Sequence, residues 1–282
     1  MKIKSSTMDK VFVACNTIFL VLFVTITLYP VLNTVALSFN DGIDAVRGGI
    51  HLWPRIFTLS NYKTVLHQQN ILTGAVVSVA RTVLGTIFSL VTNALLAYII
   101  SRKRFLFRSQ LSLFWVITMY VNGGMIPTLV LYRNMNLTNS YAGLIMVYAG
   151  SSGLGYLICK GFFDTVPVAL REAAKLDGAS EARIFFQIVI PMSRPILVYT
   201  IISSFLTPWT DFVVAKMILN SGVSSDWTVA IGLYNMLQKA LVNSYFSRFC
   251  AGGVLVAVPI SILFVICLLY TSPSPRDAHE SR

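Results

Sequence analysis

Six stretches of the chain are apolar over almost their whole length, and polar or charged residues gather between them. A helix needs about 20 consecutive apolar residues to cross the hydrocarbon core of a bilayer. The six stretches meet or approach that length, so the pattern predicts an all-α, polytopic membrane protein with six transmembrane helices. The stretches run over 11–31, 82–100, 111–131, 144–161, 196–219 and 250–270.

The first stretch follows Lys2, Lys4 and Lys10 and has no charged residue from Val11 to Asn40. A basic start before an apolar segment is also typical of a signal peptide. However, the apolar core of a signal peptide is only about 7–15 residues long and ends at a small-residue cleavage site, which is lacking here. We therefore expect residues 1–10 to be a short N-terminal segment and the first helix to be retained.

Basic residues are concentrated in two of the segments between the stretches. Cytoplasmic loops of membrane proteins carry an excess of Lys and Arg. We therefore expect both segments and both termini on the cytoplasmic side. On the outer side we expect a long first loop and the segment 220–249, where apolar positions after Trp227 predict an amphipathic surface helix. The basic residues of the two segments are Arg102, Lys103, Arg104 and Arg108, then Arg171, Lys175, Arg183 and Arg194.

Residues that disturb helices occur inside or at the ends of several stretches. Pro30 is expected to end the first helix, Asn122-Gly123-Gly124 before Pro127 to disturb the third, and Pro208 and Pro259 to interrupt the fifth and sixth. The backbone groups that proline frees must be satisfied by protein or by cavity water, which favours a packed transport bundle over passive anchors. The small residues over 149–155 would allow another helix to approach closely.

Composition supports the membrane class. The chain is 55% hydrophobic and only 12% charged, with a mean hydropathy of +0.71, whereas a soluble domain is about one quarter charged. The net charge of +11 does not indicate nucleic-acid binding, because no basic stretch alternates with aromatic residues as a stacking groove requires.

The sequence predicts no catalysis, metal or cofactor. Its four cysteines, at 15, 159, 250 and 267, have no metal-ligand spacing and are expected to be small buried apolar side chains. Its three histidines show no ligand spacing either, and no nucleophile, base and acid can be placed together. No G-x-x-x-x-G-K-[ST] loop is present to hold ATP, so energy must come from partner chains.

The segment from Glu172 to Pro191 predicts two short helices and a turn. Val168 to Asp177 is rich in helix-forming residues, and Gly178 stands where a helix ends in the left-handed conformation. Ser180 can cap a second helix, which Pro191, with Pro195 after it, stops before the fifth stretch.

This segment resembles the "EAA loop" of permease subunits of binding-protein-dependent ABC importers, whose pattern is E-A-A-x-x-x-G followed at a fixed distance by I-x-L-P. Isoleucine stands at position 190, where the pattern prefers leucine. The resemblance implies that the cytoplasmic loop 167–195 couples the permease to the ATPase, with Glu172 to Gly178 as the docking surface. The expected coupling residues are Glu172, Ala173, Ala174, Asp177, Gly178, Ile188 and Pro191.

Other segments resemble carbohydrate importers of this family, over about residues 10–270. The second half is most similar to the smaller maltose/maltodextrin-type permease subunit, and the first loop to permeases for complex or acidic oligosaccharides. The resemblance implies the type I ABC importer permease fold in a bacterial inner membrane. It also implies as partners two ATP-binding subunits, a second homologous permease, an extracytoplasmic solute-binding protein, an oligosaccharide and membrane lipid.

Trp209 and Asp211 are candidates for the sugar pathway, because aromatic faces and carboxylates suit hydroxylated rings. Asp211 is the only acidic residue within a predicted span, where a carboxylate needs a polar cavity or a cation such as Lys216. The favoured alternative places Asp211 at the outer interface as a helix cap or as a partner for a neighbouring subunit. Arg81 is likewise expected near an interface.

Two questions stay open from the sequence. The last residues, 271–282, are either a disordered Ser/Pro-rich tail or, as we prefer, foreign sequence that replaces the family's usual tail. The alternatives to a sugar importer are an ABC permease for amino acids or peptides and an ion-coupled secondary transporter. A secondary transporter would show inverted repeats and paired charges at the membrane midplane.

Overall fold

A computed structural model describes residues 7–67, 71–121, 123–150, 152–219, 228–243 and 245–271. These residues are almost entirely helical, and the described part of the chain contains no β-strand beyond one isolated antiparallel bridge between Asn40 and Phe57. The all-α prediction is confirmed. The chain divides into two compact units, of which one comprises Met1–Ile71 with Leu233–Ala257 and the other Leu72–Gly232 with Val258–Arg282.

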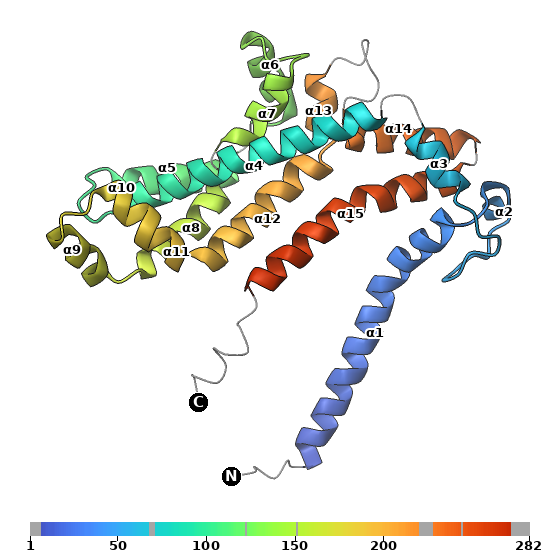
Figure 1. The fold of residues 1–282 in the computed structure, drawn as a ribbon, viewed down its shortest axis with the longest axis horizontal. Helices are drawn as coiled ribbons and strands as arrows, with labels where there is room; N and C mark the ends of the chain where they lie inside the picture. The colour runs from blue at the N-terminus through green and yellow to red at the C-terminus, as the bar shows by residue number, and fades with distance from the viewer. Residues whose placement is uncertain are drawn as a thin grey trace. The chain divides into compact units, whose positions relative to one another are not determined.

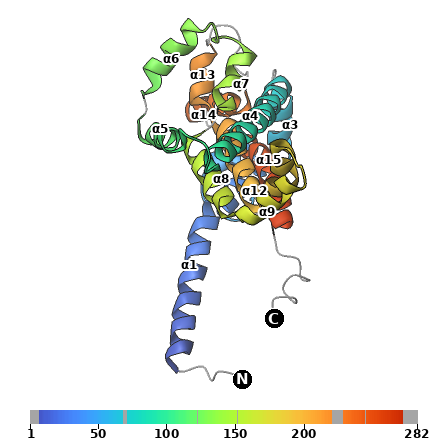
Figure 2. The ribbon, with the colours of Figure 1, turned by 90° about the vertical axis from the view of Figure 1, so that its left-hand side faces the viewer.

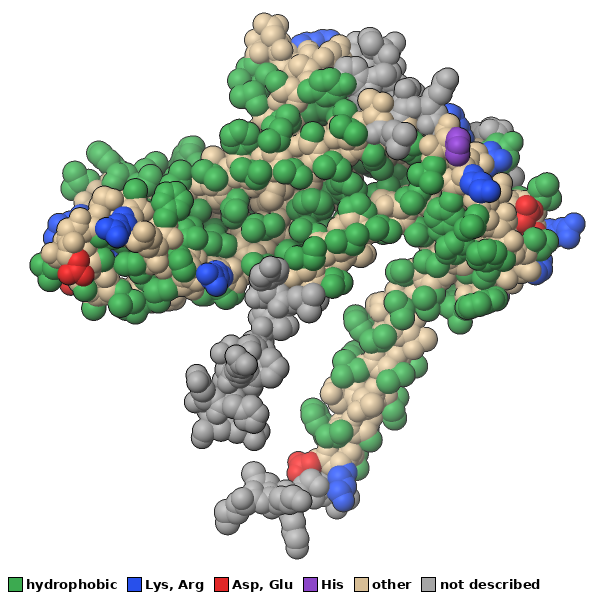
Figure 3. All heavy atoms as spheres, in the orientation of Figure 1, with side chains coloured by type: hydrophobic (Ala, Val, Ile, Leu, Met, Phe, Trp, Pro, Cys, Tyr) green, Lys and Arg blue, Asp and Glu red, His purple; other side chains and the backbone are tan. Residues whose placement is uncertain are grey.

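Helix α1 (Thr7–Ser38) is the first predicted span. Its segment Met8–Ser38 has a mean hydropathy of 2.5, and its most apolar window is not buried by the rest of the chain. Hydrophobic side chains project along its length in Figure 3. Cys15 is exposed here, so its expected burial is wrong. The helix also continues through Pro30, because one lost backbone hydrogen bond disturbs a long apolar helix only locally.

The chain after α1 forms two short helices, α2 (Gly42–Val46) and α3 (Ser60–Leu66). The buried Asp44 accepts hydrogen bonds from Asn40 and Arg55, each at 3.1 Å. Buried Asn61 donates to the backbone carbonyl of Asn40 at 2.7 Å. These hydrogen bonds satisfy buried polar groups and hold the loop after α1 in place, although its described residues form no β-sheet.

Helices α14 (Val229–Asn243) and α15 (Phe246–Thr271) follow later in the chain. Helix α14 confirms the helix expected after Trp227, although Trp227 itself lies outside the described residues. Met236 of α14 and Ala251 of α15 pack with Val65 in a small buried cluster. Pro259 lies inside α15 without ending it. Residues 272–282 of the questioned tail also lie outside the described residues.

The second unit begins with α4 (Ile71–Ser101), which starts well before the expected Thr82. It continues with α5 (Arg108–Tyr120), α6 (Met125–Asn134), α7 (Tyr141–Ala149) and α8 (Gly153–Thr165). The remaining elements are α9 (Val168–Leu176), α10 (Glu181–Ile184), a π-helical segment (Phe185–Val189), α11 (Ile190–Met192), α12 (Arg194–Thr210) and α13 (Val213–Ile218).

By length and composition, three described helices can span a membrane, or six spans result if each bent pair counts as one. The third predicted span is bent by 115° between α5 and α6, which Figure 2 shows as separate rods. Gly124 has a φ of +86° at this break. The fourth is bent by 41° between α7 and α8, where Ser152 caps α8 through the Gly155 amide. The third span thus breaks at the glycines expected to disturb it, whereas an unbroken fourth helix is wrong.

The fifth predicted span, 196–219, is also divided. Helix α12 runs through Pro208 to Thr210, and the chain turns before α13 begins at Val213. At the other end, α12 bends by 85° from the segment Glu181–Met192. The predicted close approach at the small residues over 149–155 is confirmed, because a Cβ at Gly153 would lie 2.8 Å from the Trp115 carbonyl oxygen of α5.

Candidate functional site

The loop between α8 and α12 folds as a helical hairpin. Helix α9 ends in a motif in which the Gly178 amide donates to Lys175 O at 3.0 Å and the Ala179 amide to Ala174 O at 2.9 Å. This pair of bonds is the Schellman C-cap, which requires a left-handed residue. Gly178 supplies it with a φ of +76°, so the predicted helix end is confirmed.

The second arm of the hairpin begins at the predicted cap. The Ser180 hydroxyl accepts a hydrogen bond from the Arg183 amide at 3.3 Å. Past α10 the helix widens into a π turn, in which the Ile190 amide donates to the Phe185 carbonyl. Pro191 lacks an amide proton and would crowd the carbonyl four residues before it, and the π turn lies directly before this proline. The arm ends at Met192, as expected.

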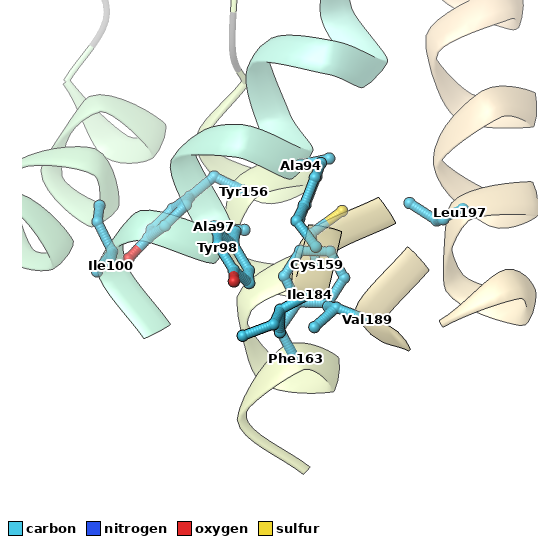
Figure 4. Close-up of a cluster of buried hydrophobic side chains, with 11 residues drawn as sticks. Ala94, Ala97, Tyr98, Ile100, Tyr156, Cys159, Phe163, Ile184, Val189 and Leu197 are labelled. Carbon is cyan, nitrogen blue, oxygen red and sulfur yellow. The ribbon is translucent and has the colours of Figure 1, made fainter. Parts of the chain in front are cut away.

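A buried cluster fastens the hairpin to α4 and α8 (Figure 4). Ile184, Phe185 and Val189 of the second arm are buried with residues of α4 and α8. The Phe185 ring centroid lies 4.7 Å from that of Tyr98 and 6.5 Å from that of Phe163. Interiors are close-packed and resist deformation, so a displacement of the hairpin must also displace the ends of α4 and α8. The buried members are Ala94, Ala97, Tyr98, Ile100, Tyr156, Cys159, Phe163, Ile184, Phe185, Val189 and Leu197.

Charged groups add a polar connection beside this cluster. Glu181 Oε1 lies 2.6 Å from Lys175 Nζ, and Oε2 accepts hydrogen bonds from Tyr98 and Arg102 of the α4 end. The hydrogen bond from Lys175 holds the pKa of the Glu181 carboxyl below its ordinary value; partial burial opposes this effect, and the charge of Arg102 adds to it. Glu181 therefore carries a negative charge at neutral pH and joins both arms of the hairpin to α4.

The structure divides the predicted coupling residues into two groups. Ala174 and Ile188 are partly buried against the cluster, so they support the hairpin from within. The others are exposed and available to a partner: Glu172, Ala173, Asp177, Gly178 and Pro191.

Leu176 lies within the predicted docking surface but was not among the expected coupling residues. Its side chain is 90% exposed at the tip of the hairpin, and Leu170 on the same helix is 46% exposed. Isolated exposed leucines are common, but an almost bare leucine beside a fixed turn offers an anchor for a partner's pocket. The signal in the sequence was an apolar residue among polar ones directly before the Asp-Gly pair.

Trp209 and Asp211 lie at the opposite end of α12. Trp209 is buried, and its ring stacks on Phe205 with centroids 5.7 Å apart. The Asp211 carboxylate accepts hydrogen bonds from Tyr148 at 2.6 Å and from the amides of Val213, Val214 and Ala215 at 3.2 Å. Asp211 thus caps α13, the helix that also carries Lys216.

Arg81 approaches the same break from α4. Its side chain is only 1% exposed, and it donates to the carbonyls of Pro208 and Asp211 and lies over the Tyr148 ring. A cation at carbonyls that end a helix is favourable. Arg81 is therefore enclosed by the helices of its unit, a role that its position before the apolar stretch did not reveal.

Metal chemistry finds no support in the part of the chain that the structure describes. No group of three or more His, Cys, Asp or Glu side chains gathers there in an arrangement that could hold an ion. Of the four free cysteines, Cys159, Cys250 and Cys267 are buried, as expected.

Comparison with known proteins gives a family match over most of the chain. The model of the family described as "Binding-protein-dependent transport system inner membrane component" matches residues 17–272. The polygalacturonan/rhamnogalacturonan transport system permease protein YtcP of Bacillus subtilis (strain 168) is 33% identical over 213 residues, 76% of this chain and 73% of that protein. The galactooligosaccharides transport system permease protein GanQ of the same organism is 32% identical over 247 residues, 86% of each chain.

A solved structure shares the fold. A chain in the crystal structure of a bacterial ABC transporter involved in the import of the acidic polysaccharide alginate matches with a TM-score of 0.83. The two chains are 22% identical, and the match covers 96% of this chain and 100% of that one. The predicted ABC importer permease fold is confirmed.

Proposed function

Because the chain belongs to the family of binding-protein-dependent transport system inner membrane components, we propose that it is the permease subunit of an ATP-driven carbohydrate importer. It would form half of the translocation pathway in the bacterial cytoplasmic membrane, together with a second homologous permease. Two ATP-binding subunits and an extracytoplasmic solute-binding protein complete the proposed complex. The oligosaccharide class is supported by the relatives, whose names refer to transport of polygalacturonan/rhamnogalacturonan and of galactooligosaccharides.

The hairpin from α9 to α11 is the proposed coupling element. The observation that carries the proposal is the construction of this hairpin. Leu176 is exposed at its tip, and the second arm packs against the ends of α4 and α8. Figure 1 shows α9, α10 and α11 together at one end of their unit, beside the last turns of α4. A partner that binds the tip can therefore displace α4 and α8 through the buried cluster that packs the hairpin against them.

The mechanism is alternating access. ATP binding draws the two ATPase subunits together, and each carries one docked hairpin with it. The buried cluster transmits this displacement to α4 and α8, and the cavity between the two permeases opens outward to receive sugar from the binding protein. Both termini and the loops 102–108 and 167–195 lie on the cytoplasmic side in this proposal, in line with their basic residues.

For Trp209 and Asp211, at the end of α12 far from the hairpin, we propose a structural role in preference to direct binding of sugar. The carboxylate of Asp211 is occupied by Tyr148 and by the backbone of α13, and Trp209 is buried. These contacts favour the helix-cap interpretation over direct binding of sugar. Asp211 would then set the direction of α13 and influence the pathway through it.

The competing functions predict other features. An ion-coupled transporter would not need a helical hairpin with an exposed apolar tip, and the family match counts against it. An importer of amino acids or peptides shares the hairpin, so only the substrate separates it from a sugar importer. The sugar-related names of the relatives favour the carbohydrate class.

The test is reconstitution of the chain with the ATPase, second permease and binding protein of the proposed complex, followed by transport across a panel of oligosaccharides, amino acids and peptides. Uptake of an oligosaccharide that depends on ATP is the expected result. Gly178→Pro, which cannot adopt a positive φ, and Glu172→Lys should abolish or strongly reduce that uptake. Uptake of amino acids or peptides alone, or uptake driven by an ion gradient without ATP, would contradict the proposal.

A further inference from the structure

A basic pocket lies between the start of the α4–α5 loop and helix α9, on the second unit. Its volume is about 360 Å³. It is bounded on α9 by residues three and four positions apart, which share one face of a helix. The lining residues are Arg102, Lys103, Arg104, Val168, Arg171, Glu172, Lys175 and Glu181.

Positive charge dominates this basic pocket. Five of the lining residues are Lys or Arg and two are Glu. Glu181 already pairs with Lys175 and Arg102. Burial lowers the pKa of Arg102, and the charge of Arg171 adds to this effect, whereas Glu181 opposes it. An anion in the pocket would relieve the repulsion between these two arginines.

Arg171 is the most enclosed of these cations. Its side chain is only 8% exposed, and Nη2 makes a long hydrogen bond of 3.4 Å to the Val166 carbonyl. Its Nε has no hydrogen-bond partner among the described residues, and the same holds for Nε of Arg102. Buried donors without an acceptor are rare and costly. These two guanidinium groups also line the pocket, and their charge, together with that of the exposed Arg104, favours a planar or tetrahedral oxyanion there.

The position of the basic pocket indicates which anion it meets. Its first residue, Arg102, directly follows the apolar helix α4, which ends at Ser101. Leu106 and Phe107, in the same short loop, are 89% and 61% exposed. Cations beside bare apolar side chains at the end of a spanning helix are typical of the lipid headgroup layer, where basic pockets bind acidic headgroups. Figure 3 shows Lys and Arg side chains at this end of the unit, next to exposed hydrophobic ones.

We propose that the basic pocket binds the phosphate of an anionic phospholipid headgroup between Arg102, Arg104 and Arg171. The pocket is large enough for a phosphate with a small polar substituent such as glycerol, since small-ligand sites begin at about 300 Å³. A lipid held there lies against the face of α9 that carries Arg171, while Leu176 lies outside the lining. Glu172 of the predicted docking surface also lines the pocket, so the lipid and the protein partner would adjoin at Glu172, and the tip at Leu176 would contact the partner alone.

The test is native mass spectrometry of the full-length chain in detergent, with phosphatidylglycerol and phosphatidylcholine offered at equal concentration. The chain should retain phosphatidylglycerol preferentially. Arg171→Gln and Arg104→Gln should each weaken that binding by roughly tenfold, because each removes a charge-assisted bond to the phosphate. Arg104 is exposed, so its variant keeps the fold even if the buried Arg171 is needed for folding.

Arg133→Gln is the matched control, because Arg133 is an exposed arginine on α6 outside the basic pocket. Equal retention of the two lipids, or the same loss in the Arg133 variant, would overturn the proposal. Displacement of phosphatidylglycerol by millimolar inorganic phosphate, with phosphate retained in its place, would make this a site for free phosphate instead. Pocket variants that bind lipid normally but lose the ATPase subunit would assign the pocket to the protein partner.

Discussion

Lys175 Nζ lies 2.6 Å from Glu181 Oε1, so an ion pair joins the last turn of α9 to the first turn of α10 across Gly178. The pair closes a turn that the backbone has already defined through the Schellman cap. The hairpin thus has a fixed shape before any partner binds, and docking does not have to order it.

The first prediction concerns pH. Glu181→Gln should lower the stability of the chain at neutral pH by only about 0.2–1 kcal/mol, because the carboxylate is half-exposed and screened by solvent. The folded-state pKa of Glu181 is lowered, so its contribution is present above the ordinary carboxyl pKa and disappears as pH falls through the lowered value. Thermal unfolding of both proteins from neutral to acidic pH measures the difference. A difference that grows in acid would refute the assignment.

The second prediction concerns the turn. Gly178→Ala should destabilise the hairpin by roughly 1–2 kcal/mol, because a Cβ disfavours the left-handed conformation at a φ of +76°. Hydrogen exchange of the loop amides reports the local loss. Gly42→Ala is a suitable control, since Gly42 has open space and no positive φ. If both variants exchange alike, the turn does not depend on the left-handed residue.

The third prediction concerns the break between α12 and α13. Tyr148→Phe removes the 2.6 Å hydrogen bond to Asp211, which should cost about 1.5–3 kcal/mol because the acceptor is charged. Asp211→Asn should weaken the same bond, so the double variant should lose less than the sum of the two. Melting in detergent measures all three, with Tyr120→Phe as a control at an exposed tyrosine. Strict additivity would mean that the two side chains do not interact.

The sequence predicted the apolar spans well because burial in lipid needs only a long apolar run, which is a local property. It indicated the break after α5 through its glycines and Pro127, but it did not predict the size of that bend or the bend after α7. Gly124 and Ser152 act there through a positive φ and a helix cap, and neither changes the hydropathy of the stretch. The Pro30 prediction failed for the opposite reason: proline is a visible local signal, but a long helix tolerates it.

In the candidate site, too, local features were predictable from the sequence and contacts between distant residues were not. Gly178 and Ser180 were predictable because turn and cap chemistry depends on neighbouring residues. The contacts of Glu181 with Tyr98 and Arg102 join residues far apart in the chain, and no periodicity in one sequence indicates such a pair. The contacts of Arg81 were not predicted for this reason too, because its partners Tyr148 and Asp211 are far from it in the chain.

The most direct test of the coupling proposal is ATPase activity of the reconstituted complex carrying Leu176→Asp, with sugar and binding protein present. Ile43→Asp is the matched control, since Ile43 is 79% exposed but lies on α2, which does not belong to the hairpin. A charge at the tip cannot enter an apolar pocket without a large desolvation cost. We predict that Leu176→Asp loses ATPase binding and sugar-stimulated hydrolysis while Ile43→Asp retains both. Full stimulation in the Leu176→Asp complex would contradict the assignment of the hairpin as the coupling element.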